Sequence, residues 1–161
     1  MQTDWKAWFD THGSRLMLFA RQQTRREADA EDVLQETLAR LCEAGRNGPP
    51  DLPLVYTALR RTAIDHARRR ERRRVREERV AADEPIAFFD EGVEARERAH
   101  LVEEALRRLP EPQQEVLILK IWGELTFAQI GETVGISPHT AASRYRYALQ
   151  ALKQQLSPSP L

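Results

Sequence analysis

Residues 126–146 of the chain read TFAQIGETVGISPHTAASRYR, and this stretch decides the fold. Thr126, followed three residues later by Gln129, forms the signature of a capping box and predicts a short helix that begins there. Gly135 suits the left-handed turn that ends a helix, and Ser137 with the proline after it predicts the start of the next helix. Two helices joined by a short glycine-containing turn are typical of a helix-turn-helix.

The second helix of this pair has the composition of a DNA-binding helix. From Ser137 to Lys153 it carries three basic residues and no acidic one, which suits the polyanionic backbone of nucleic acid. Its N-terminal turn would enter the major groove, where hydroxyls hold phosphates and arginines reach phosphates or base edges. The predicted DNA-binding residues are His139, Thr140, Ser143, Arg144 and Arg146.

The chain as a whole has 161 residues, and its 25 basic and 25 acidic side chains give a formal net charge of zero. This length allows one domain or two small ones of about 70–80 residues. No apolar run approaches the roughly 18 residues that cross a bilayer, and no apolar signal core opens the chain. One cysteine excludes an intrachain disulfide and a cysteine-rich zinc site, so we expect a reducing, cytoplasmic location and no membrane association.

The charges are strongly segregated along the sequence. Residues 27–43 have a net charge of −5, residues 60–79 have +6, and residues 83–97 have −5. Arginine makes up 22 of the 25 basic residues, and its planar guanidinium favours bidentate contacts to phosphate and guanine. We therefore expect surfaces of opposite sign that bind different partners, one of which is nucleic acid.

Helical periodicity predicts an all-α protein of two small helical domains joined by a flexible acidic linker, with the helix-turn-helix in the second domain. The first domain has an amphipathic N-terminal helix, an acidic helix over about residues 29–44, and an arginine-rich helix that starts near Pro53. The linker contains an apolar anchor at Ile86, Phe88 and Phe89. The predicted boundaries are residues 1–79 for the first domain, 80–97 for the linker, 98–156 for the second domain and 157–161 for a tail.

Other chemistry finds little support in the sequence. Cys42 lies beside the apolar stripe of the acidic helix, which predicts a buried structural thiol. The four histidines are scattered without carboxylates at metal-binding spacing, so we expect no metal and no other cofactor. Because a glycine-rich phosphate loop, a nucleophile triad and a paired acid and base are all missing, we expect no enzyme.

Three stretches, in order, resemble bacterial RNA polymerase sigma factors of the extracytoplasmic-function group, which has two conserved domains. Residues 109–117 (LPEPQQEVL), together with the helix-turn-helix, resemble the domain that binds the promoter −35 element. Residues 29–37 (DAEDVLQET) resemble the helix of that group that binds core polymerase. Residues 54–66 (LVYTALRRTAIDH) resemble its −10-recognition helix. The resemblance covers nearly the whole chain and implies an alternative sigma factor.

The resemblance also implies partners for the first domain. Its acidic helix would bind the coiled coil of the clamp in the largest polymerase subunit, through Asp29, Asp32, Gln35 and Glu36. Its arginine-rich helix would lie along the −10 element of promoter DNA, and the candidate contacts there are Arg60, Arg61, Arg68 and Arg69.

For the second domain the resemblance implies contact with the polymerase flap, besides the −35 DNA. The family is commonly held by an anti-sigma factor, which makes such a protein a candidate partner. In the recognition helix, Ala142 and Tyr147 stand where the family often has Lys and Arg. These departures predict an unusual −35 sequence preference.

Two other functions stay open on the sequence. A helix-turn-helix regulator that acts without polymerase would bind its DNA tightly as the free protein. A sigma mimic would occupy core polymerase without opening promoters. The mimic is kept open by the short loop over residues 45–51, by the missing family tryptophan near Leu54, and by Arg61 in place of an asparagine.

Overall fold

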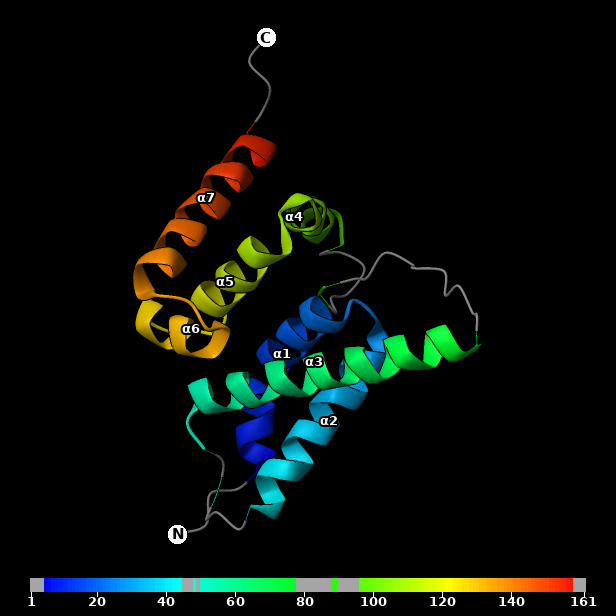
Figure 1. Cartoon of the computed structure of the whole chain (residues 1–161). Helices are drawn as coiled ribbons and strands as arrows, with labels where there is room; N and C mark the ends of the chain where they lie inside the picture. The colour runs from blue at the N-terminus through cyan, green and yellow to red at the C-terminus, as the bar shows by residue number, and fades with distance from the viewer. Residues whose placement is uncertain (1–4, 45–47, 49, 78–87, 90–95, 158–161) are drawn as a thin grey trace. The chain divides into compact units, whose positions relative to one another are not determined.

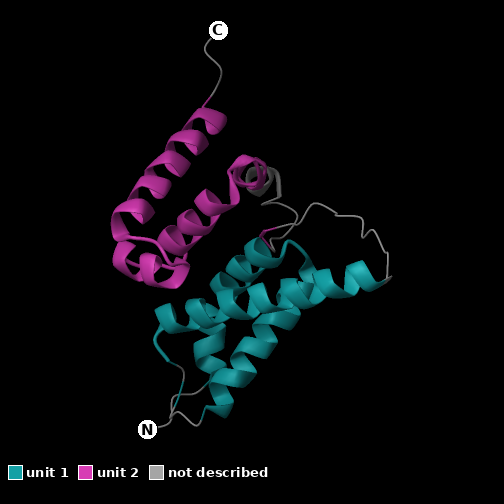
Figure 2. Cartoon of the chain, in the orientation of Figure 1, with its two compact units in different colours: residues 1–86 teal, residues 87–161 magenta. Residues whose placement is uncertain are grey.

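The computed structural model describes residues 5–44, 48, 50–77, 88–89 and 96–157. Within these residues all regular secondary structure is helical, and Figure 1 labels the helices from α1 to α7. The chain divides into two compact units, residues 1–86 and residues 87–161 (Figure 2). The prediction of an all-α protein in two small helical domains is therefore confirmed.

The first unit is a three-helix cluster in which every helix packs on the other two. It consists of α1 (Trp5–Thr24), α2 (Glu27–Glu43) and α3 (Leu52–Glu77), and α3 lies across the other two (Figure 1). The core is apolar and fully buried, with the Phe19 ring edge-on to Tyr56 at a centroid distance of 5.4 Å. The loop predicted over residues 45–51 lies mostly outside the described residues.

A tight corner sets the angle between α1 and α2. Arg25 has a left-handed backbone with φ of 61°, a conformation that a non-glycine residue adopts only when its surroundings hold it. The Thr24 hydroxyl lies 2.9 Å from the carbonyl of Ala20 and 3.1 Å from that of Arg26. Arg21 also donates from Nε and Nη2 to the two carboxylate oxygens of Glu27, at 2.8 and 2.9 Å. These contacts join α2 to α1 and involve no residue of α3.

The second unit contains α4 (Arg96–Arg108), α5 (Glu111–Ile121), α6 (Phe127–Val134) and α7 (Pro138–Leu156). Helix α7 packs on the other three, and α6 lies where α5 and α7 approach each other (Figure 1). The Gln114 side chain, 1% exposed, donates to the carbonyls of Leu106 and Leu109 at 2.7 and 3.0 Å. It gives the Leu109 carbonyl, just past the end of α4, a donor, and it adds a second donor to the Leu106 carbonyl, which also accepts the backbone N–H of Leu109 at 3.1 Å.

Part of the predicted linker belongs to the second unit. Phe89 donates its backbone N–H to Glu103 at 3.0 Å, and its ring lies 5.6 Å from that of Trp122. Phe88 is fully buried. Ile86 and most of the acidic linker lie outside the described residues. Helix α4 begins at Arg96, two residues inside the predicted linker.

The prediction of a buried thiol at Cys42 is wrong, because Cys42 is exposed. Its position near the apolar stripe was judged from sequence spacing, but the stripe that α2 buries consists of Ala30, Val33, Leu34 and Thr37. Cys42 comes seven residues after the exposed Gln35, which places both on the same side of the helix, two turns apart.

None of the helices in the described part of the chain has the length and apolar character to cross a membrane.

Candidate nucleic-acid interface

The helix-turn-helix of the second unit has the geometry that the sequence predicts. The backbone N–H of Gln129 donates to the Thr126 hydroxyl at 3.1 Å, and that of Thr126 donates to the Gln129 side chain at 2.9 Å. Gly135 ends α6 with φ of 83°. Ser137 caps α7 by accepting the backbone N–H of Thr140 at 3.0 Å. Both predicted helix starts and the turn between them are confirmed.

One glycine that the sequence analysis did not single out makes the turn this tight. A Cβ added to Gly131 in α6 would lie 2.5 Å from the carbonyl oxygen of Ile136 and 3.4 Å from the nitrogen of Pro138. Both of these atoms belong to the backbone, which cannot rotate away as a flexible side chain can. The close approach at Gly131 therefore sets where α7 begins.

The five predicted DNA-binding residues occupy the first turns of α7. His139 and Arg146 are exposed, while Thr140, Ser143 and Arg144 are half-buried. The Ser137 hydroxyl donates to Oγ1 of Thr140 at 2.9 Å, so the hydrogen of the Thr140 hydroxyl stays available to an acceptor such as phosphate. Nη2 of Arg146 lies 3.4 Å from the Ser143 hydroxyl.

Tyr147 is a further residue of this surface that the sequence analysis left out of its candidates. It is 57% exposed and lies one turn beyond Ser143 and two turns beyond Thr140, on the same side of α7. The signal in the sequence was its phase on the helix: positions 140, 143 and 147 share one side, away from the buried Ala141 and Ala148.

An aromatic pair and a cation–π contact hold α7 in place. The rings of Phe127 and Tyr145 lie 5.6 Å apart, which joins α6 to α7. Nζ of Lys120 on α5 lies 4.4 Å from the centre of the Phe127 ring and donates to the carbonyl of Leu125 at 3.2 Å. Lys120 was not predicted as part of the site, and it acts on α7 only through its neighbours.

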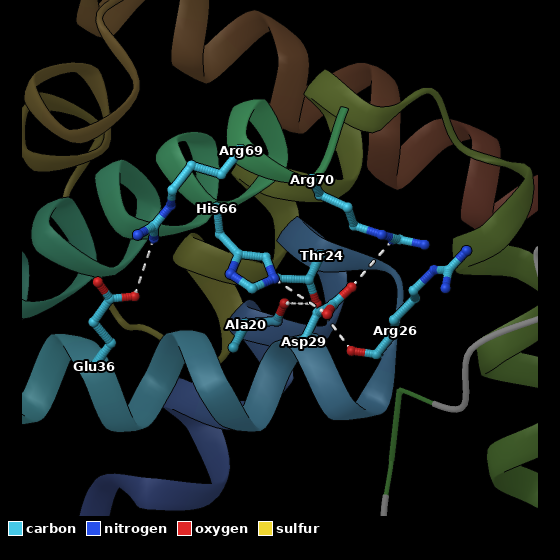
Figure 3. Close-up of polar contacts among 8 residues, drawn as sticks. All are labelled: Ala20, Thr24, Arg26, Asp29, Glu36, His66, Arg69 and Arg70. Carbon is cyan, nitrogen blue, oxygen red and sulfur yellow. Dashed lines mark hydrogen bonds and ion pairs between the residues drawn. The ribbon is translucent and has the colours of Figure 1, made fainter. Parts of the chain in front are cut away.

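The four predicted polymerase-binding residues of α2 are not equivalent. Asp32 and Gln35 are exposed. Oδ1 of Asp29 lies 3.1 Å from Nε2 of His66 and its Oδ2 lies 3.1 Å from Nη1 of Arg70, both on α3 (Figure 3). Glu36 accepts from Arg40 on its own helix at 2.7 Å and from Arg69 on α3 at 3.4 Å. Asp29 and Glu36 thus contact the arginine-rich helix.

The four predicted −10 contacts of α3 also differ. Arg61 and Arg68 are exposed, and neither pairs with another residue in the described ranges. Arg60 is half-buried and already has a partner, and Arg69 is paired with Glu36. An open groove runs along this side of the helix, and it is lined by Arg40, Asp65, Arg68, Arg69, Glu71 and Arg72.

No group of three or more potential metal-binding side chains occurs among the residues that the structure describes.

Comparisons with known proteins cover both units. The family model described as sigma-70 region 2 matches residues 8–73, and the one described as sigma-70, region 4 matches residues 99–152. The RNA polymerase sigma factor SigV of Bacillus subtilis is 30% identical over 140 residues, which cover 85% of this chain and 81% of the relative. The ECF RNA polymerase sigma factor SigL of Mycobacterium tuberculosis is 30% identical over 155 residues, which cover 94% and 88%.

A solved structure has the same fold. The sigma factor RpoE of Bartonella quintana, crystallised with the anti-sigma factor NepR, superposes with a TM-score of 0.69 at 21% identity, covering 94% of this chain and 95% of that one. The two domain matches, in the order that the sequence predicts, favour neither a free-standing regulator nor a sigma mimic. The chain therefore belongs to the extracytoplasmic-function family of bacterial sigma factors, and it is an alternative sigma factor that directs transcription initiation.

Proposed function

We propose that the two units divide the work of the sigma factor between them. The first unit binds core polymerase through α2 and the −10 element through α3, and the second binds the −35 element through α7. The observation that carries this proposal is the charge of the first unit, where α2, with its exposed acidic and amide groups, packs on α3, with its exposed arginines. Neighbouring surfaces of opposite sign suit two partners of opposite charge that are bound together.

The polymerase surface is the exposed side of α2, with Asp32 and Gln35 at its centre and Glu36 at its edge. A carboxylate and an amide that are both free in the unbound protein need break no internal pair to bind a basic partner. The partner that we propose is the coiled coil of the polymerase clamp.

The −10 surface is the side of α3 that carries Arg61 and Arg68, together with the groove beside Arg68. Arginines that are exposed and unpaired can bind phosphates without first losing an ion pair, and such contacts depend strongly on salt. Arg60 and Arg69 contribute less in this proposal, because each already has a partner in the free protein.

The −35 surface is the N-terminal part of α7. Three features favour anion binding there: the positive end of the helix dipole, the Thr140 hydroxyl, and the arginines at 144 and 146. Of the two arginines we assign Arg144 to base edges and Arg146 to phosphate. In this proposal the second unit also contacts the polymerase flap, an anti-sigma factor holds the free protein, and the chain itself catalyses no reaction.

Run-off transcription with purified core polymerase on fragmented genomic DNA tests the proposal. We expect discrete start sites that appear only with the protein, and the sequenced transcripts then reveal both promoter elements. Asp32→Arg should abolish the starts by preventing core binding, whereas Arg144→Ala should leave core binding intact and weaken promoter recognition. Stable core binding without any start would support a sigma mimic. Loss of core binding by both variants alike would refute the division of labour.

A further inference from the structure

The acidic side chains of α2 separate into two sets by their phase on the helix. Asp29 and Glu36 are seven residues apart, so they share one side, and both reach across to α3 (Figure 3). Asp32 and Gln35 are exposed and form no such link within the described residues. A family resemblance in sequence assigns all four to the same partner, but their contacts do not.

Asp29 is the more deeply engaged member of the first set. Its side chain is 19% exposed, and its two oxygens each lie 3.1 Å from a nitrogen of α3, one on His66 and one on Arg70. Residues 66 and 70 are one turn apart and so present their nitrogens from the same side of α3. A basic side chain of another protein would have to compete with both partners for a carboxylate that is largely shielded from solvent.

Apolar packing of α3 ends just before this point, since Ala63 is its last buried residue in the described part of the helix. A partly open pocket of about 200 Å³ lies beside Asp29; polar and charged side chains line most of it, and Ala63 and Ala67 of α3 are its small apolar residues. Where side chains of two helices are not closely packed, packing alone does not select one position of a helix along its neighbour. The polar links from α2 then hold α3 in register here, and Asp29 makes the two shorter ones, at 3.1 Å, against 3.4 Å between Glu36 and Arg69.

We propose that Asp29 is a positioning residue and not a polymerase contact: it sets the register of the DNA-binding helix α3 on the polymerase-binding helix α2. This inference rests on the proposed function and refines it. Helix α2 keeps its own position without Asp29, because Arg21, Glu27 and Thr24 fix the corner to α1. Loss of the Asp29 carboxylate therefore moves Arg61 and Arg68 relative to the polymerase surface while leaving that surface in place.

The test compares Asp29→Asn with Asp32→Asn, two isosteric changes that each remove one negative charge from the same helix. Core polymerase affinity and promoter opening by the reconstituted holoenzyme are measured for both, at a temperature where circular dichroism shows both fully folded. We expect Asp29→Asn to stay within about twofold of the wild type in core affinity and to lose about tenfold in promoter opening. Asp32→Asn should instead lose core affinity by a similar factor.

A double-mutant cycle provides the second measurement. Asp29→Asn, Arg70→Gln and the double variant are compared for unfolding of the free protein and for promoter opening at saturating core. If Asp29 acts through Arg70, the double variant should be no worse than the worse single variant in either measurement. Arg70→Gln should reproduce the opening defect with normal core affinity, which a loss of stability alone would not do.

Three results would overturn the inference: an equal loss of core affinity in Asp29→Asn and Asp32→Asn, unchanged promoter opening in Asp29→Asn, or additive effects in the cycle. The wild-type protein in the same assays tests the proposed function separately. If it neither binds core polymerase nor opens promoters, the proposed function fails. The unfolding cycle on the free protein still decides whether Asp29 positions α3 through Arg70.

Discussion

Replacing Arg144 by Ala should weaken promoter binding without weakening the fold. In the free protein Arg144 is half-buried and pairs with no other described residue, so its removal breaks no hydrogen bond or ion pair there and the free energy of unfolding should change little. If its guanidinium makes a bidentate contact to a base, the loss in binding is about 1–3 kcal/mol, or roughly 5- to 150-fold in affinity. The loss should be confined to promoters with the preferred base at one position of the −35 element.

The assay measures binding of the holoenzyme to a set of promoters that differ singly across the −35 element, at two or more salt concentrations. For Arg144→Ala we expect reduced discrimination at one position and a nearly unchanged salt dependence. Arg146→Ala is the matched control, since it removes an arginine of the same helix that we assign to phosphate. It should weaken all promoters alike and reduce the slope of log affinity against log salt by about 1.

The reasoning fails if the two variants behave alike. A uniform loss in Arg144→Ala, with the lower salt slope, would make Arg144 a phosphate contact. Loss of discrimination in Arg146→Ala would mean that the two arginines have exchanged roles, and that the phase of α7 in the groove differs from the one proposed.

Three further predictions concern other parts of the chain. The exposed thiol of Cys42 lies on the proposed polymerase surface, so saturating core polymerase should protect it from a thiol-specific reagent. Asp32→Arg should abolish this protection, and equal labelling with and without core polymerase would place the surface elsewhere. Glu36→Gln should release Arg69 in the free protein, and in a fluorescence titration of DNA binding by that protein the slope of log affinity against log salt should steepen by about 0.7–0.9. An unchanged slope would show that Arg69 binds no phosphate. Gly131→Ala should lower the unfolding midpoint of the second unit and weaken −35 binding, because a methyl group 2.5 Å from a backbone oxygen forces the turn to move. An unchanged midpoint in calorimetry would show that the turn accommodates the methyl group without loss of stability.

The capping box of α6 and the starts of α6 and α7 could be predicted because their signals are local. Thr126 with Gln129, and Ser137 with Thr140, satisfy backbone groups within one turn, so the residues that make each cap are neighbours in sequence. Cys42 was misjudged for the opposite reason. Which residues of a helix are buried depends on the angle at which another helix packs on it, and spacing along one helix does not contain that angle.

The charged residues of the first unit also could not be sorted from the sequence into paired and free side chains. The sequence by itself determined that the acidic and arginine-rich helices exist, how they are charged and which partners suit them. Only the tertiary structure decided that Asp29 and Arg70, 41 residues apart, are paired while Asp32 and Arg61 are free. The physical reason is that charge is a property of each side chain, whereas availability depends on which groups the packing of two helices brings within about 3 Å.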